Sequence, residues 1–405
     1  MSSRIHFLLV LQASLTFTPL AACAPPFGER DVATLAARAP TRPAPPGRGD
    51  GPALASAALA APLVAGVAGA ELALVDPSTG LVGARAATGG QVRELAFDAV
   101  RGALFSFEAD ADGEAGTVAR YRVEPAPSEG AGAGGGAGAE DELARATLSA
   151  REVRGWLEGR ARLAPVAAGL VVLAEGYGSA WRLWSDEGPA LPSAPAPAPQ
   201  SLWVTSGDGP DELGALAHRD GELVLARATV ADGLGAVHTL GLGPSLAAPP
   251  TARAVARGDE VVVVDRDGDD LVVGTSSGGE LEETGRLTVP GARVLDAAWL
   301  AADGAVDGAP GPMLALVLDE PASAALVVLD AAGSPQAACQ APLDAPLDAG
   351  DGLGVRALVT WGGRHLFVAG RDRAWQLRAE VGATGCTLEL EGVVAGLGAP
   401  IAALR

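Results

Sequence analysis

The sequence predicts an all-β protein, and three observations support this prediction. Of the 405 residues, 55 are Gly and 30 are Pro, which favours many short strands joined by turns over long helices. The stretch 251–289 holds four short apolar runs, and the Asp-Gly and Gly-Gly turns between them are strong signals for hairpins. Similar runs recur along the chain, the compact ones near the roughly 40–50 residues that a four-stranded unit needs. We therefore expect a β-propeller of about seven four-stranded blades, with six or eight as alternatives.

The stretch Thr251–Val289 has the pattern of one complete blade. Its expected strands are Ala252–Arg257, Glu260–Val264, Leu271–Thr275 and Leu281–Val289. The two middle strands are apolar on both faces, as expected for strands buried between neighbours. The last strand mixes Glu and Thr with Leu and Val, which is typical of an outer strand.

Residues 1–22 have the features of a signal peptide. Arg4 precedes the apolar run Phe7–Leu20, which is too short to span a bilayer comfortably. The run ends in Leu20-Ala21-Ala22-Cys23, which resembles the lipobox of bacterial lipoprotein signal peptides. The resemblance implies that the signal is cut before Cys23 and that acyl chains on this cysteine anchor the protein stably to a membrane. The alternative is an ordinary secretory signal with an incidental cysteine.

The residues after the cysteine extend this resemblance. Ala24, and not Asp, follows Cys23, and in a two-membrane bacterium the family's sorting pattern then implies the outer membrane. Residues 23–60 are rich in Ala, Pro and Arg and predict a lipidated, poorly ordered tether. Residues 61–405 are expected to form the propeller domain.

A second resemblance lies in residues 71–107. The matching letters are Val75-Asp76, Thr79-Gly80, Val82 and Leu95-Ala96-Phe97. They resemble the YVTN-type propeller repeat, although residues 98–102 stand in place of its Pro-Asp-Gly turn. The resemblance covers about a tenth of the chain well and implies the same fold as the strand pattern.

The strand pattern predicts the blades in chain order. The first spans 92–150, with strands Val92–Phe97, Ala103–Glu108 and Thr117–Val123, a mobile low-complexity insertion at 124–143, and a last strand after it; residues 151–160 are either a helical turn or an outer strand. The second holds Leu163–Ala168, Leu170–Ala174 and Ala180–Trp184, and the third holds Leu202–Ser206, Leu213–His218, Leu223–Thr229 and Ala236–Leu242. The fourth is the stretch 251–289. The fifth holds Arg293–Leu300, Met313–Leu318, Ala324–Leu329 and Gln336–Ala341, and the sixth holds Val355–Trp361, Arg364–Ala369, Ala374–Arg378 and Cys386–Val393.

The two ends of the chain are expected to complete the seventh blade together. The C-terminal segment Pro400–Leu404 resembles the first strand of each blade, and no second strand follows it. The N-terminal part supplies three strands without a first one: Pro62–Val67, Glu71–Asp76 and Leu81–Ala86. Pairing the C-terminal strand with these strands would leave no sheet edge open in the ring.

Composition excludes several functions. The net charge of −20 leaves no basic stripe that could meet phosphates, so nucleic acid is not an expected partner. The chain contains no Lys, which excludes a P-loop and the Schiff-base chemistry of pyridoxal phosphate. It contains no Asn, which excludes N-glycosylation.

Cys339 and Cys386 are the two cysteines outside the lipobox. Each falls in the outer strand of a predicted blade, and an oxidising envelope would permit a disulfide. Against pairing, equivalent outer strands of neighbouring blades could diverge beyond the Cα separation of about 7 Å that a disulfide allows. The sequence leaves this pairing open. No Cys-x-x-Cys is present and no His lies near either cysteine in sequence, so zinc is not expected.

Two stretches of alternating carboxylates resemble calcium loops. One contains Asp265, Asp267 and Asp269, and the other contains Glu108, Asp110 and Asp112. Neither has a closing Glu at the expected spacing, and the first has its Gly too early. Solvated hairpin tips are the alternative interpretation, and no metal site is predicted.

No stretch of the sequence has the pattern of a catalytic site. Ser276 lies in a G-x-S-x-G pattern, but it lies between two strands and not between a strand and a helix. The three His residues of the mature chain are His218, His238 and His365, and none falls in a first strand that would line the axis of the ring. The Trp residues are expected to pack the blades, and Trp203, Trp299 and Trp361 could instead face a binding surface. The full set is Trp156, Trp181, Trp184, Trp203, Trp299, Trp361 and Trp375.

The sequence therefore favours a lipid-anchored, non-catalytic envelope propeller that binds a protein, glycan or small ligand. No convergent set of His, Asp, Glu or Lys is apparent in it, and no cofactor is predicted. The alternative is a propeller enzyme, either a lactonase-like hydrolase or a quinone-dependent dehydrogenase. Such enzymes need a metal or several ionisable side chains at the axis, so clustered carboxylates there would favour the alternative.

Overall fold

A computed structural model describes most of the chain after residue 62. The described residues are 63–125, 146–175, 180–185, 188–189, 194–195, 199–205, 210–219, 222–231, 233–244, 252–277, 279–291, 293–301, 311–347, 356–382 and 385–404. The predicted signal peptide, Cys23, the predicted tether and most of the predicted insertion at 124–143 lie outside them. In the part that is described, no helix is long and apolar enough to cross a membrane.

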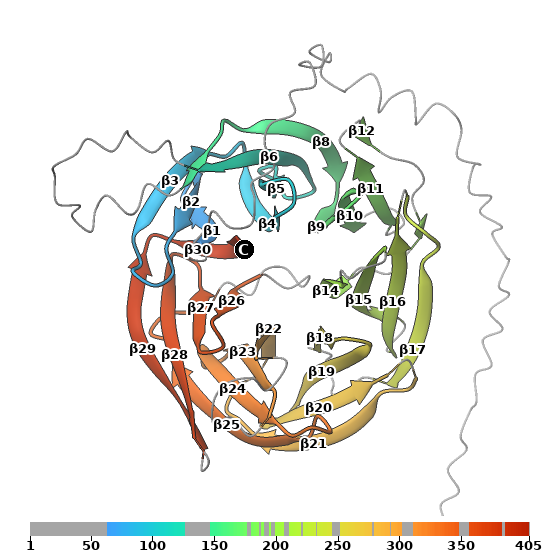
Figure 1. The fold of residues 1–405 in the computed structure, drawn as a ribbon, viewed down its shortest axis with the longest axis vertical. Coiled ribbons are helices and arrows are strands. Elements are labelled where there is room, and N and C mark those ends of the chain that lie inside the picture. Colours follow the sequence, from blue (N-terminus) through green and yellow to red (C-terminus); the bar gives the residue numbers. More distant parts are fainter. Residues whose placement is uncertain are drawn as a thin grey trace, which may run out of the picture. The chain divides into compact units, whose positions relative to one another are not determined.

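Seven antiparallel sheets form a closed ring, which confirms the predicted seven-bladed β-propeller (Figure 1). Blade one contains β4 (Gln91–Asp98), β5 (Ala103–Ala109), β6 (Ala115–Pro125), β7 (Ala146–Leu148) and β8 (Glu152–Glu158). Blade two contains β9 (Arg160–Val166), β10 (Gly169–Glu175), β11 (Ala180–Ser185), β12 (Gly188–Pro189) and β13 (Ala194–Pro195). Blade three contains β14 (Pro199–Thr205), β15 (Asp211–Arg219), β16 (Glu222–Val230) and β17 (His238–Pro244).

The remaining blades follow in the same order. Blade four contains β18 (Arg253–Arg257), β19 (Glu260–Asp267), β20 (Asp270–Ser276) and β21 (Glu282–Thr288). Blade five contains β22 (Arg293–Ala301), β23 (Met313–Asp319), β24 (Ser323–Leu329) and β25 (Pro335–Pro342). Blade six contains β26 (Leu358–Trp361), β27 (His365–Ala369), β28 (Arg373–Gly382) and β29 (Gly385–Ala395). Blade seven contains β30 (Gly398–Leu404), β1 (Leu63–Ala68), β2 (Glu71–Val75) and β3 (Val82–Ala87).

Blade seven closes the ring as the sequence predicts. The C-terminal strand β30 is its inner strand and pairs antiparallel with β1, with Leu63 opposite Leu404 and Ala65 opposite Ala402. In Figure 1 the red C-terminal strand lies beside the blue N-terminal strands. Because this pairing joins the two ends of the chain, blade seven is built from both the C-terminal strand and the N-terminal strands.

The outer positions of blades one and two are divided between short strands. In blade one, both β7 and β8 pair with β6. The segment 151–160, which the sequence left open between a helical turn and a strand, therefore supplies the outer strand β8. In blade two, both β12 and β13 pair with β11.

The core lies between the blades, and each pair of neighbouring blades encloses one apolar cluster. The run Val261–Val264 in β19 shows why the middle strands are apolar on both faces. Val261 and Val263 pack toward blade three, whereas Val262 and Val264 pack toward blade five. Successive side chains of a strand point to opposite faces, so both faces of such a strand must be apolar. With few aromatic residues, Val, Leu and Ala fill these interfaces.

The four Trp residues outside the inner strands differ in how deeply they are buried. Trp181 and Trp375 are buried between blades, as packing residues should be. Trp156 in the outer strand β8 is 44% exposed and is therefore less buried than Trp181 and Trp375. Trp184 is partly buried and joins the cluster between blades one and two.

The three Trp residues near the ends of inner strands make local contacts. Trp203 lies over Gly214, its partner on the adjacent strand β15. The indole N–H of Trp299 donates to the carbonyl of Ala256 at 2.7 Å and so connects β22 to β18. Trp361 stacks on His365 with ring centroids 5.1 Å apart, and a binding role for any of the three remains a prediction.

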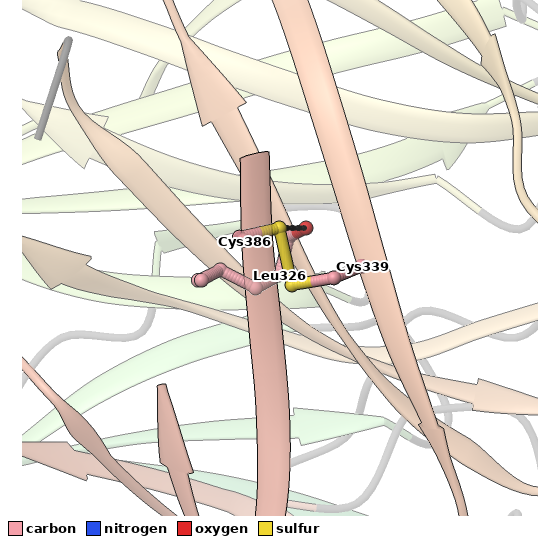
Figure 2. The surroundings of a disulfide bond; sticks show 3 residues. All are labelled: Leu326, Cys339 and Cys386. Atoms are coloured by element: carbon pink, nitrogen blue, oxygen red, sulfur yellow. Dashed lines mark hydrogen bonds between the residues drawn. A yellow bond between two sulfur atoms is a disulfide. The ribbon is translucent and has the colours of Figure 1, made fainter. Parts of the chain in front are cut away.

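Cys339 and Cys386 form a disulfide between blades five and six (Figure 2). Cys339 lies in β25 and Cys386 in β29, and their Cα atoms are 5.6 Å apart. The two outer strands contact one another side by side, so they do not diverge beyond disulfide reach as the sequence argument against pairing assumed. The disulfide therefore ties two consecutive blades together at the rim of the ring.

Candidate binding site at the axis of the ring

Five charged side chains lie at similar places in or next to inner strands that are mainly apolar. Four lie in β4, β9, β18 and β22, and the fifth lies two residues before β26. We call them the axial cluster: Glu94, Arg162, Arg253, Asp296 and Arg356. The inner strands surround the axis of the ring (Figure 1). Each of the five residues is followed by two apolar residues, so they occupy similar places in their strands.

Glu94 lies between two arginines from other blades. Its Oε1 atom is 3.2 Å from Nε of Arg162 and 3.3 Å from Nε of Arg356. The side chains of Glu94 and Arg162 are only 1% and 7% exposed, whereas that of Arg356 is 31% exposed. The three residues form an ion-paired triad that is buried at one end and open to solvent at the other.

Among the described residues, Glu94 Oε2 has no hydrogen-bond partner, although it is buried. A buried acceptor that lacks a donor costs free energy. A group that donates a hydrogen bond at this position would recover that cost.

Both carboxylate oxygens of Asp296 accept hydrogen bonds from backbone N–H groups. Its Oδ2 accepts from the N–H groups of Ala357 at 2.8 Å and Leu358 at 3.0 Å, and its Oδ1 accepts from the N–H of Ala297 at 2.9 Å. Burial raises the pKa of this carboxyl, while the backbone bonds and the positive charges of Arg162 and Arg253 oppose the rise. Asp296 therefore fastens blade five to blade six and also balances charge within the axial cluster.

Arg253 is buried and reaches from blade four to blade five. Its Nε donates to the carbonyl of Leu295 at 2.9 Å, and its Nη1 donates to its neighbour Ala252 at 3.0 Å. Burial lowers the pKa of this guanidinium to about 10, and the nearby carboxylates of Asp296 and Asp265 oppose that shift. Arg253 therefore stays charged at neutral pH.

Uncharged polar side chains link other inner strands in the same way. Ser201 Oγ accepts from the N–H of Ala254 at 2.9 Å, which joins blade three to blade four. Thr360 Oγ1 donates to the carbonyl of Trp299 at 2.7 Å, which joins blade six to blade five. Blade-to-blade hydrogen bonds thus account for part of the polar inner surface, but not for Glu94 Oε2.

His218 on β15 lies within electrostatic reach of Arg253 and Asp265. Both of its ring nitrogens are buried and have no hydrogen-bond partner among the described residues. Burial lowers the pKa of the imidazole, and the charge of Arg253 adds to the shift while that of Asp265 opposes it. The imidazole is therefore neutral at pH 7, with one donor and one acceptor that the described part of the chain leaves unused.

The other two His residues differ from His218. His238 is exposed at the start of the outer strand β17. His365 begins β27 and stacks on Trp361, with its Nδ1 buried and unpartnered in the described structure. Neither belongs to the axial cluster.

The carboxylates of the first calcium-like stretch do not converge. Asp265 is fully buried, Asp267 is exposed and pairs with Arg286 at 2.5 Å, and Asp269 is exposed in a turn. Asp265 accepts a hydrogen bond from the N–H of Arg266 at 2.9 Å. Only Asp267 and Asp269 fit the interpretation of a solvated hairpin tip.

In the second calcium-like stretch, Glu108 is a core residue, whereas Asp110 and Asp112 are exposed. Glu108 Oε1 accepts from Tyr121 at 2.7 Å and Ser106 at 2.8 Å. Its Oε2 accepts from the Nε of Arg151 at 2.7 Å and from a backbone N–H at 2.8 Å. Across the described residues, no group of three or more His, Cys, Asp or Glu is arranged to hold a metal ion.

Ser276 does not lie in a nucleophile elbow. It ends β20, and its Oγ donates to the carbonyl of Gly279 at 2.7 Å in the turn that leads to β21. The serine is buried and its hydroxyl serves the turn. This placement agrees with the strand-to-strand context in the sequence.

Sequence reasoning missed the axial cluster. Three of the five members are arginines, whereas the convergent set expected of an active site consisted of His, Asp, Glu and Lys. The signal that was available is a charged residue in, or directly before, five mainly apolar predicted first strands, each time followed by two apolar residues. That signal becomes informative only when the strands are known to meet at one axis.

Comparisons with known proteins agree on the fold alone. No protein-family model and no curated protein matches the chain. A functionally unknown protein from Desulfotomaculum acetoxidans is similar at 12% identity and a TM-score of 0.54, covering 84% of this chain and 98% of that one. The dihydro-heme d1 dehydrogenase NirN, solved in complex with DHE, is similar at 11% identity and a TM-score of 0.50, covering 86% of this chain and 66% of that one. Apo AztD from Citrobacter koseri is similar at 9% identity and a TM-score of 0.48, covering 84% of this chain and 97% of that one.

Proposed function

We propose that the protein is a lipid-anchored propeller of the bacterial cell envelope that binds a small ligand without catalysing a reaction. The axial cluster is its ligand site. One observation carries this proposal: charged side chains from five blades meet at the axis, and Glu94 Oε2 among them is buried with no donor in the described part of the chain. Sites for small ligands combine a rigid scaffold with a few convergent polar groups of this kind.

Buried ion pairs add little to stability on average, which supports a role in recognition. Removing two charges from water costs several kcal/mol per ion, and apolar side chains of similar volume often stabilise a fold equally well. The Arg162–Glu94–Arg356 triad therefore needs a reason other than stability. Binding of a charged or polar ligand supplies that reason.

The binding part of the proposal is tested on protein purified from the host envelope. Native mass spectrometry of the wild type should show a bound small molecule that is absent from a Glu94→Gln variant and present in an Asp110→Asn control. Affinity capture with the lipidated protein tests in parallel whether a protein or glycan is the partner. Wild-type protein that carries no small molecule, and whose capture partners are unchanged by Glu94→Gln, would contradict the proposal.

The lipid anchor rests on the Leu20-Ala21-Ala22-Cys23 lipobox. A Cys23→Ala substitution removes the only thiol at which the anchor can form, so we expect the variant to leave the membrane fraction. Sucrose-gradient fractionation, which separates inner from outer membrane, tests the proposed location as well. Unchanged membrane association of the variant would show that the cysteine is incidental.

His218 supports a second candidate function, a lactonase-like hydrolase. A neutral imidazole near Arg253 could serve as a general base for water while the arginine stabilises a developing oxyanion. Lactone hydrolysis that is measured by pH-stat and lost in His218→Gln would establish this function. Bound calcium or quinone, found by metal analysis or absorbance of the purified protein, would also establish an enzyme in place of a binding protein.

A further inference from the structure

The charges of the triad define what it can attract. Two guanidinium groups, on Arg162 and Arg356, share a single carboxylate oxygen of Glu94. Three ionised groups of which two are positive leave one unit of positive charge. Within the axial cluster, the carboxylate of Asp296 interacts electrostatically with Arg162 and Arg253, but its oxygens accept hydrogen bonds from backbone N–H groups. The triad therefore favours a ligand with a single negative charge.

Arg356 is the member of the triad that such an anion can reach. Its side chain is 31% exposed, while those of Arg162 and Glu94 are buried. A guanidinium offers several N–H donors in a plane, and this geometry matches a carboxylate. A carboxylate carries one charge, whereas a phosphate monoester carries nearly two at neutral pH, so the charge of the triad matches a carboxylate better.

Glu94 Oε2 adds a second requirement. It is a buried acceptor without a donor among the described residues, so a ligand held by Arg356 gains from placing a hydrogen-bond donor there. Two arginines lie within 3.3 Å of the other oxygen of this carboxylate. Their charges repel an ammonium group but not a hydroxyl group. The donor that fits is therefore an uncharged hydroxyl.

We infer that the axial cluster binds a small hydroxycarboxylate. Arg356 pairs with the carboxylate of the ligand, Glu94 Oε2 accepts from its hydroxyl group, and Arg162 holds Glu94 in position. This inference rests on the proposed binding function and specifies its ligand class.

Two sets of isosteric probes test the inference on the wild-type protein. Propionate, lactate and alanine share one carbon skeleton, and so do succinate, malate and aspartate. Within each set the members differ by a hydrogen, a hydroxyl or an ammonium group at the same carbon. Isothermal titration calorimetry should find the hydroxylated member of at least one set to bind tightest, by roughly tenfold over the member without the hydroxyl. This comparison needs no variant and so does not depend on how substitutions affect folding.

Variants then assign the roles of the two residues. Arg356→Gln should weaken every probe that binds by roughly tenfold or more, because it removes the charge that pairs with the carboxylate. Glu94→Gln should bring the hydroxylated probe and its parent to within about threefold of each other. Arg378→Gln, at an exposed arginine of β28 that pairs with Glu380, is the matched control and should change neither.

Three results would overturn the inference. The members of each set could bind equally, the amino acids could bind tightest, or all six probes could show dissociation constants above about 10 mM. Tighter binding of methyl phosphate than of acetate would contradict the choice of carboxylate. If native mass spectrometry finds a bound molecule but the probes fail, the ligand class is wrong and the binding function stands. If both experiments fail, the proposed function is wrong as well.

Discussion

Glu108 illustrates how a single residue can be misjudged from its neighbours in sequence. Its place two residues before Asp110 suggested a calcium loop or a solvated tip. In the structure it accepts four hydrogen bonds inside the core, and burial together with its carboxylate raises the pKa of the Tyr121 hydroxyl. Glu108 lies within β5, which is buried on both faces, whereas Asp110 lies beyond the end of the strand and is exposed.

Replacing Glu108 should therefore destabilise the protein strongly. Glu108→Ala leaves Tyr121, Ser106 and Arg151 without their shared partner, and we expect the free energy of unfolding to fall by about 3–5 kcal/mol. Urea denaturation followed by Trp fluorescence measures this change. Asp110→Ala is the control and should stay within about 0.5 kcal/mol of the wild type. Equal effects of the two substitutions would show that Glu108 is a surface residue.

His218 should make stability depend on pH. Its pKa lies below the ordinary value of 6.5 because the ring is buried, so the folded state binds fewer protons than the unfolded state as the pH falls. Stability is therefore fully present above about pH 6.5 and decreases below it. We expect His218→Gln to reduce the loss of stability between about pH 7.5 and pH 5.5.

The matched control for His218→Gln is His238→Gln, because His238 is exposed. Chemical denaturation at the two pH values compares both variants with the wild type. If His218→Gln loses as much stability on acidification as the wild type does, burial does not disfavour the charged imidazole.

Two features at the scale of strands and blades can be tested in the same way. Gly214 on β15 faces Trp203 on β14, and a Cβ atom at Gly214 would overlap the indole ring. We expect Gly214→Ala to lower the free energy of unfolding by about 1–3 kcal/mol, because the indole cannot move away without losing its packing. Gly241→Ala on β17, where a Cβ would meet nothing within 4 Å, is the control. A neutral Gly214→Ala variant would mean that Trp203 is not packed as described.

The disulfide is the second feature at this scale, since it joins β25 to β29. It closes a segment of 47 residues, and cross-links of this span typically contribute about 2–5 kcal/mol by restricting the unfolded chain. We expect the double variant Cys339→Ser, Cys386→Ser to lose stability in this range and to become insensitive to reducing agent. Thermal unfolding of the wild type and the double variant, with and without dithiothreitol, measures this loss of stability. Wild-type unfolding that reductant leaves unchanged would contradict the prediction.

At the scale of the whole molecule, some features could be predicted from the sequence and others could not. Turns containing Gly and runs such as Val261–Val264 predicted strands, and the unpaired segment Pro400–Leu404 predicted closure of the ring, because these are local patterns with a local physical cause. The axial cluster depends on which residue of each inner strand faces the axis. That depends on strand register and on the closed ring, neither of which a single strand specifies. The disulfide likewise depends on how closely two outer strands approach.

The ring also explains how distant charges can meet. Glu94, Arg162 and Arg356 lie far apart in sequence, yet their strands all contact neighbours around one axis. Each of five blades contributes one position, so a cluster of this kind can be assembled without disturbing the apolar interfaces between blades. The central claim is that the ring maintains this cluster for recognition and not for its own stability.

One measurement tests that claim most directly: the free energy of unfolding of the triple variant Glu94→Leu, Arg162→Met, Arg356→Met. If the triad exists for binding, apolar side chains of similar size remove a desolvation cost, and stability should be unchanged or higher by about 1–4 kcal/mol. A decrease of about 3 kcal/mol or more would show that the triad holds the blades together, and the recognition site would have to be sought elsewhere on the ring.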